Sequence, residues 1–198
     1  MGTNKMNIFY KVFEIGRTKF GQMIRGIYQF LYWAIFSSIY KEIHISSFIS
    51  PGAVVRTKKS IRLGRDCLIR KGTSISGQSI SLGDNVRLGY GSHIFGGDDI
   101  IQIGDNVMIA PNVVIAGGYH GTDRSGVPMV FQDGVSKGPI IIGNDVWLGA
   151  NSVVLSNITI GDGVVVGAGS VVNKDLPDYA IAAGNPVKII KYRAEQSN

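Results

Sequence analysis

The sequence predicts an all-β solenoid, a parallel β-helix of about six coils, and three observations support this fold class. An aliphatic residue recurs at every sixth position from Ile142 to Val172, and a second small or branched residue follows each of them after four positions. Glycine contributes 27 of the 198 residues, roughly twice its usual share of about 7%. A period of six matches short parallel strands separated by turns, and glycine suits the tight corners between such strands.

Residues 1–42 form the first predicted element, an N-terminal helical segment. Apolar residues recur there at helical spacings of three and four between Phe20 and Ile35. The chain has a formal net charge of +6, and most of the excess comes from this segment. The basic residues are Lys5, Lys11, Arg17, Lys19 and Arg25. The apolar run near the end of the segment is shorter than the roughly 20 residues that a membrane span requires.

Two interpretations of the N-terminal segment stay open. The helix could cap the first coil, which would otherwise expose apolar surface and unpaired strand edges. It could instead lie on an anionic membrane surface, with Tyr28, Tyr32 and Trp33 at headgroup depth. The rest of the chain is nearly balanced in charge and has no basic stripe, so nucleic-acid binding is not expected. A cytoplasmic protein, at the inner face of the membrane if the helix binds lipid, is the expected location.

The solenoid is predicted over residues 43–176. Its six coils begin at Ile43, Leu63, Leu82, Ile103, Ile142 and Ile160. Cys67 is the only cysteine and occupies a small inward position, so we expect a buried structural thiol and no disulfide framework.

An inserted loop, residues 116–141, interrupts the repeat. The inward aliphatic residue that follows Ile115 is Ile142, 27 positions later instead of six. Long loops on rigid scaffolds are often functional, and His120 is the chemical candidate in this one. A polar corner with Asp98 and Asp99 precedes the loop by one coil; it could reach a ligand or simply be solvated.

A short tail, residues 177–198, is predicted to leave the repeat. Its basic residues Lys188, Lys191 and Arg193 recur near helical spacing. They could form a solvated basic tail, or they could bind a phosphate-bearing ligand.

Five ordered motifs resemble the hexapeptide-repeat sugar O-acetyltransferases, most closely the galactoside and maltose acetyltransferase branch. The motifs are Ile103–Ile115, His120, Ile142–Gly149, Val166–Asp175 and Ala183–Lys188. The resemblance covers roughly residues 60–193. It implies a left-handed parallel β-helix, a homotrimer, acetyl-CoA as the acyl donor, and active sites between neighbouring subunits. It implies no metal.

The same resemblance assigns roles to individual residues. His120 matches the catalytic base of the family, and Trp147 matches the aromatic residue beside the pantetheine arm of CoA. The complete set implied to bind the cofactor is Trp147, Ala150, Ala168, Lys174, Lys188 and Lys191. Of these, the two alanines match positions whose backbone meets CoA, and the lysines match polar or basic positions near its nucleotide end.

The chemistry accounts for these residue types. An alcohol is a poor nucleophile at neutral pH, so a histidine with an ordinary pKa of about 6.5 can take its proton as it attacks the thioester carbonyl. A backbone N–H from the turn between Gly149 and Ala150 would stabilise the oxyanion. No covalent acyl-enzyme is required.

The chain departs from the family pattern in two places. The small-sugar enzymes carry a sugar-binding asparagine near the position of His93, and this chain has none there. His93, Asp98 and Tyr119 are therefore the candidate acceptor-binding residues. The aromatic N-terminal segment is more similar to acyltransferases of capsule, lipopolysaccharide or exopolysaccharide assembly. The expected acceptor is a sugar hydroxyl of a surface glycan or its precursor.

Alternative functions follow from the same residues. The runner-up is acetyl transfer to a nucleotide-linked amino sugar or to an antibiotic. A non-enzymatic alternative is a scaffold in a glycan-assembly complex. A carbonic anhydrase of the γ type would need three histidines around a metal, whereas His44, His93 and His120 are spread over separate coils.

Overall fold

The computed structural model describes residues 42–56 and 61–194, together with six helical residues near the N-terminus. These six are Met23, Gly26, Ile27, Phe30, Leu31 and Ala34. The chain divides into two compact units, Met1–Ile39 and Tyr40–Asn198. In the described part of the chain, no helix is both long and apolar enough to cross a bilayer.

The N-terminal predictions fall mostly outside the described residues. This holds for Tyr28, Tyr32 and Trp33 and for all five basic residues of the segment. Among the six residues that are described, the four large apolar side chains are exposed. They are Met23, Ile27, Phe30 and Leu31.

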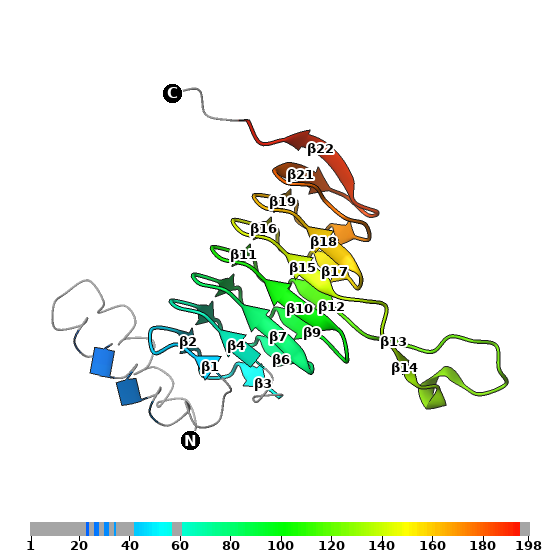
Figure 1. Ribbon diagram of the computed structural model, residues 1–198, viewed down its shortest axis with the longest axis horizontal. Coiled ribbons are helices and arrows are strands. Elements are labelled where there is room, and N and C mark those ends of the chain that lie inside the picture. The colour runs from blue at the N-terminus through cyan, green and yellow to red at the C-terminus, as the bar shows by residue number, and fades with distance from the viewer. Residues whose placement is uncertain are drawn as a thin grey trace, which may run out of the picture. The chain divides into compact units, whose positions relative to one another are not determined.

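The second unit is the predicted parallel β-solenoid, built from three sheets that we name A, B and C (Figure 1). Sheet A contains β1 (Glu42–Ile43), β4 (Ile61–Leu63), β7 (Ser79–Leu82), β10 (Ile100–Ile103), β15 (Ile140–Ile142) and β18 (Ile158–Ile160). Sheet B contains β2 (Phe48–Ile49), β5 (Leu68–Ile69), β8 (Arg87–Leu88), β11 (Met108–Ile109), β16 (Trp147–Leu148), β19 (Val165–Val166), β21 (Ala180–Ala183) and β22 (Lys188–Tyr192). Sheet C contains β3 (Val54–Val55), β6 (Ser74–Ser76), β9 (His93–Phe95), β12 (Val114–Ala116), β17 (Val153–Leu155) and β20 (Val171–Val172).

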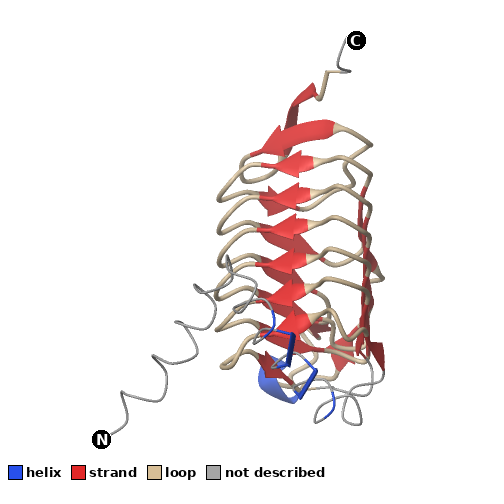
Figure 2. Cartoon of the chain, turned by 90° about the vertical axis from the view of Figure 1, so that its left-hand side faces the viewer, coloured by secondary structure: helices blue, strands red, loops and turns tan. Residues whose placement is uncertain are grey.

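The six-residue period sets the register of these sheets. Ile103 pairs with Leu82 in the preceding coil and with Ile142 in the following coil, so equivalent residues stack along the solenoid (Figure 2). The aliphatic residues from Ile142 to Val172 that define the period are all buried, which confirms that they face inward. Serines in the small inward positions are satisfied locally; Ser170, for example, donates to the carbonyl of Gly167 at 2.7 Å.

The solenoid has about seven turns, one more than the six predicted. Six complete three-strand coils are followed by a partial turn, in which Leu176 bridges to Ile160 and β21 pairs in parallel with β19. β22 then returns antiparallel to β21. The sequence conceals this turn because Leu176 comes 16 positions after Ile160, whereas a full coil of the repeat takes about 18 residues.

A ladder of side-chain acceptors runs along the corner between sheets A and B. Its members are Asp84, Asp105, Asn144, Asp162 and Asp178, each accepting a backbone N–H from the preceding coil. The bond from the backbone N–H of Arg65 is the largest cause of the lowered pKa of Asp84. The ladder joins successive coils at a corner where strand hydrogen bonds end.

Cys67 is buried in the first part of the solenoid, as predicted, and is 2% exposed. Its thiol donates to the carbonyl of Gly83 at 3.0 Å, and burial raises its pKa. A raised pKa disfavours the thiolate, so the structure gives Cys67 a packing role.

Candidate active site

The inserted loop leaves the solenoid at the corner between sheets C and A, between β12 and β15. It contains a short antiparallel hairpin of β13 (Tyr119–His120) and β14 (Gly134–Val135), with a 3-10 turn, η3 (Met129–Phe131), near its tip. Figure 1 shows this hairpin projecting away from the stacked coils. The amide side chain of Gln132 braces the tip, since it bonds both the N–H and the carbonyl of Asp123.

His120 lies on this hairpin, opposite Gly134, with an exposed side chain. Its neighbour Tyr119 is half-buried, and the ammonium group of Lys137 lies 3.8 Å from the centre of the Tyr119 ring. Successive side chains of a strand point to opposite faces, so Tyr119 packs on one side and His120 points to the other. The imidazole is therefore open to a ligand, on a hairpin with its own hydrogen bonds.

The candidate acceptor-binding residues lie around the same corner. Asp98 is exposed one coil before the loop, and its carboxylate accepts a hydrogen bond from Gln78. Its neighbour Gly97 packs against Gly118, where the loop begins. Asp98 therefore lies near the start of the inserted loop, which leads directly into the hairpin strand that carries His120.

His93 lies on the outer face of sheet C, in the strand of the coil before the loop. Its ring stacks on Phe95, with centroids 5.6 Å apart and planes 8° from parallel. Its Nδ1 atom is buried and has no hydrogen-bond partner among the described residues. His93 begins β9 of sheet C, and Asp98 lies at the corner that follows this strand.

The residues implied to bind CoA gather mainly on sheet B. Trp147 is 48% exposed on the outer face of this sheet. It belongs to a row of outward side chains in register across five neighbouring strands, Met108, Trp147, Val165, Ile181 and Lys191. Neighbouring strands are about 4.8 Å apart, so the row is roughly 19 Å long. The row is apolar from Met108 to Ile181 and has a cation at each side, Lys191 after Ile181 and Arg87 in register before Met108.

Ala150 and Ala168 occupy the corner between sheets B and C in successive coils. The carbonyl of Ala150 accepts the N–H of Gly169 at 2.8 Å, which stacks one corner on the other. Lys188 is exposed at the end of sheet B, where it pairs with Ala183. Lys174, in contrast, follows β20 at the corner between sheets C and A, so one chain does not bring it together with Lys188 and Lys191.

Most of the predicted site residues thus form two groups in one chain, and Lys174 belongs to neither. The base group, His120, Tyr119 and Asp98, lies at the corner between sheets C and A. The donor group, which includes Trp147 and Lys191, lies on sheet B and at its edge. These positions belong to different faces of the solenoid.

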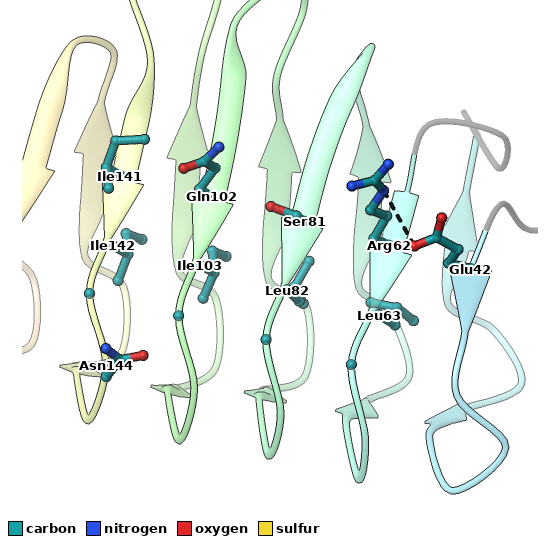
Figure 3. A pocket seen from close by; sticks show the side chains of 14 residues that line it. Glu42, Arg62, Leu63, Ser81, Leu82, Gln102, Ile103, Ile141, Ile142 and Asn144 are labelled. Carbon is teal, nitrogen blue, oxygen red and sulfur yellow. Dashed lines mark ion pairs between the residues drawn. The ribbon is translucent and has the colours of Figure 1, made fainter.

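A shallow groove of about 520 Å³ runs over sheet A, and it involves neither group. Arg62, Ser81, Gln102 and Ile141 line it along successive coils, and Arg62 pairs with Glu42 at 3.4 Å (Figure 3). The groove is a property of the regular sheet and contains none of the predicted catalytic or binding residues.

No group of three or more His, Cys, Asp or Glu side chains is placed to hold a metal ion within the residues that the structure describes. The three histidines occupy different sheets and corners. His44 follows β1 and contacts Ser46, His93 lies in sheet C, and His120 lies in the loop.

Sequence reasoning placed Asp99 in a polar corner that reaches a ligand or solvent, but it missed that this residue is buried, at 2% exposed, where the loop joins the solenoid. Its carboxylate accepts hydrogen bonds from the N–H of Gly118 and the hydroxyl of Ser136, at the two ends of the loop. A signal was present in the sequence, because alternation backward from the inward Ile103 and Ile101 also places Asp99 inward.

Comparison with known proteins identifies the repeats. A model described as bacterial transferase hexapeptide matches residues 139–174, and a model of the hexapeptide repeat of succinyl-transferase matches residues 60–96 and 79–116. The first model matches the coils after the inserted loop, and the second matches coils before it. His120 lies outside the matched residues.

A chloramphenicol acetyltransferase of Agrobacterium fabrum (strain C58) is 44% identical over 61 residues, which are 31% of this chain and 29% of that protein. The chain spans about a third of the length of the curated relatives it matches.

Among solved structures, a maltose O-acetyltransferase from Clostridium difficile 630 is 29% identical, with a TM-score of 0.58. The match covers 82% of this chain and 74% of that one. AntD, an N-acyltransferase from Bacillus cereus in complex with dTDP and 3-hydroxybutyryl-CoA, has a TM-score of 0.73 at 24% identity. This match covers 81% and 87% of the two chains and shows a shared fold.

Proposed function

We propose that this chain, which carries the hexapeptide repeats of bacterial transferases, is an acetyl-CoA-dependent O-acetyltransferase of a sugar hydroxyl. The acceptor that we propose is a surface glycan or its precursor. The observation that carries the proposal is that one chain has both an exposed histidine on a braced hairpin and an apolar row of side chains with a lysine at one end.

The outer face of sheet B fits the chemistry of CoA. Met108, Trp147 and Val165 offer apolar contact to a pantetheine arm, and Lys191 at the end of the row offers a cation to a nucleotide phosphate. At the adjacent corner, Ala150 and Ala168 carry only methyl side chains, so a ligand can approach their backbone closely. When bound, acetyl-CoA would supply an activated acyl group as a thioester.

His120 acts as the general base in this scheme. Its neutral imidazole takes the proton of the acceptor hydroxyl while the hydroxyl oxygen bonds to the thioester carbonyl carbon. The carbon–sulfur bond breaks, and the imidazolium returns its proton to the leaving thiolate. Products are the acetyl ester and the free CoA thiol, with no change of oxidation state. A backbone N–H near Gly149 stabilises the charge that develops on the carbonyl oxygen.

We propose a homotrimer in which the site forms between two copies. The base group and the donor group lie on different faces of one chain, so a neighbouring copy would supply the missing group. The outer face of sheet C supports close contact between copies, because Val114, Val153 and Val171 form an apolar row along it.

A second candidate acceptor is a small alcohol of the antibiotic type, a class to which the name of the chloramphenicol acetyltransferase relative points. Release of CoA thiol from acetyl-CoA can be measured with a panel of acceptors. The panel contains maltose, oligosaccharides of surface polysaccharides, an amino sugar linked to dTDP, and chloramphenicol. Turnover on glycans supports the proposal, turnover on chloramphenicol alone favours the second candidate, and turnover on neither excludes both.

We also propose that the N-terminal segment makes a peripheral contact with the inner face of the membrane and brings the enzyme to a lipid-linked glycan. The exposed apolar side chains of Met23, Ile27, Phe30 and Leu31 support this proposal. Co-sedimentation with anionic vesicles should fall when residues 1–40 are removed. Equal binding of the full and shortened chains would exclude the membrane role and favour the capping role.

A further inference from the structure

Asp99 is a buried carboxylate at the corner where the inserted loop joins the solenoid. It directly precedes β10, and its side chain points inward like those of Ile101 and Ile103. A buried charge is costly unless hydrogen bonds or an opposite charge compensate it. The ion pairs among the described residues do not include Asp99, so its compensation comes from neutral donors.

These donors come from three separate segments of the chain. The N–H of Gly118, at the start of the loop, bonds Oδ2 at 2.8 Å. The hydroxyl of Ser136, near the end of the loop, also donates a hydrogen bond to the carboxylate. Ser156 of the next coil has its hydroxyl 3.1 Å from Oδ2. One side chain therefore joins the start of the loop, the end of the loop and the following coil.

The bonding keeps Asp99 ionised. Burial acts to raise the pKa of Asp99, but the hydrogen bonds from Ser136, Gly118, Ser156 and Gly138 together hold it below its ordinary value. An ionised carboxylate has about four acceptor positions, whereas a neutral amide oxygen has about two. The hydrogen-bond donors around Asp99 outnumber the acceptor positions of an amide oxygen, so asparagine, which has the same size, cannot replace the carboxylate.

The local backbone is shaped to allow this contact. Gly118 has a φ of +72°, a conformation that favours glycine, and it places its N–H on the carboxylate. His120 is only two residues further along, and its hairpin partner Gly134 lies two residues before Ser136. The clamped ends therefore set where the hairpin, and with it the imidazole, stands on the solenoid.

We propose that Asp99 is the positioning residue of the catalytic loop: it clamps both ends of the hairpin and fixes His120 relative to the coils. The catalytic half of this statement rests on the proposed function, whereas the clamp itself does not. General-base catalysis requires the imidazole to lie within hydrogen-bond reach of the acceptor hydroxyl. A loosened loop therefore lowers turnover more than it weakens the binding of acetyl-CoA.

The test compares the full-length wild type with Asp99→Asn and, as a matched control, Asp123→Asn, an exposed aspartate of the same loop. Amide hydrogen exchange of residues 117–138 reports on the clamp without any substrate. We expect Asp99→Asn to speed exchange in this segment about tenfold and to leave the core strands of sheets A, B and C unchanged. The control should exchange like the wild type.

Steady-state kinetics provides the second measurement. We expect kcat to fall about tenfold or more in Asp99→Asn, with the KM for acetyl-CoA within about threefold of the wild type. If Asp99→Asn does not fold, Ser136→Ala removes one exposed donor and should change both measurements in the same direction by about threefold.

The outcomes separate the two proposals. Unchanged exchange in residues 117–138, or faster exchange throughout the solenoid, would overturn the clamp. Faster exchange confined to the loop, with kcat unchanged, would overturn the positioning role. Faster loop exchange in a protein whose wild type transfers no acetyl group would support the clamp and reject the proposed function.

Discussion

At the scale of single residues, His120 and Trp147 are the exposed side chains on which the proposed site depends. Most aliphatic residues of the repeat are buried, whereas Trp147 keeps 48% of its surface exposed. A large aromatic side chain on the outer face of a strand adds little to the stability of the solenoid core. We therefore propose that its apolar surface contacts a ligand.

The Trp147→Ala variant tests this assignment. Removal of the indole should raise the KM for acetyl-CoA about tenfold and change kcat little, because the contact is made equally before and during the reaction. Ile100→Ala is the matched control, since Ile100 is similarly exposed but lies on sheet A. An unchanged KM in Trp147→Ala would remove Trp147 from the proposed donor site.

At the scale of the element, close backbone contacts at the corners between strands keep successive coils in a regular stack. Gly143 precedes Asn144 in the acceptor ladder between sheets A and B. A Cβ at Gly143 would lie 2.9 Å from the backbone N of Asp162 and still closer to its Oδ1. Backbone atoms of the next coil cannot move away without loss of strand pairing, so any larger residue strains the stack.

Gly143→Ala should therefore destabilise the solenoid by about 1–3 kcal/mol. Thermal unfolding should show a fall of roughly 5 °C in Tm. Gly134→Ala is the control, because a Cβ there would meet only the carbonyl oxygen of Tyr119, at 3.7 Å. Equal Tm values for Gly143→Ala and the wild type would show that the corner can expand.

The sequence predicted the elements whose conformation depends on residues close together in the chain. The spacing of Ile103, Ile109 and Ile115 places one inward residue in each strand of a coil, and all three are buried. The hairpin of β13 and β14 has no such signal, since it depends on contacts between residues far apart in the chain. Asp99 and Ser136 meet across 37 positions, and no periodic pattern records that meeting.

The donor group shows the same limit. Trp147, Lys188 and Lys191 were selected by motif, but their common sheet depends on β22 returning antiparallel to β21. The predicted tail gave no indication of that return. Lys174 was selected together with them but lies at another corner, because it follows β20 of sheet C, whereas Lys188 and Lys191 belong to β22 of sheet B.

At the scale of the whole molecule, the separation of the base group from the donor group predicts that active sites are shared between copies. One variant, His120→Ala, lacks the base and keeps the donor group. A second variant, Trp147→Ala with Lys191→Glu, keeps the base and lacks donor contacts. Co-expression of the two should restore activity, since random mixing in a trimer leaves about a quarter of the sites intact.

Mixed assemblies would be purified through two different tags and compared with each variant alone. At an acetyl-CoA concentration well below the KM of the donor variant, turnover several-fold above either parent supports sharing of sites. Turnover no greater than that of the separately purified variants would place the whole site within one chain and contradict the proposed arrangement.

The most direct measurement of the central claim is the release of CoA thiol by the wild type and by His120→Ala on a confirmed acceptor. We expect kcat to fall by about 10²–10⁴, with Tm unchanged because the imidazole is exposed. His44→Ala, an exposed histidine far from the loop in sequence, should retain full turnover. Full turnover in His120→Ala would contradict the assignment of His120 as the base.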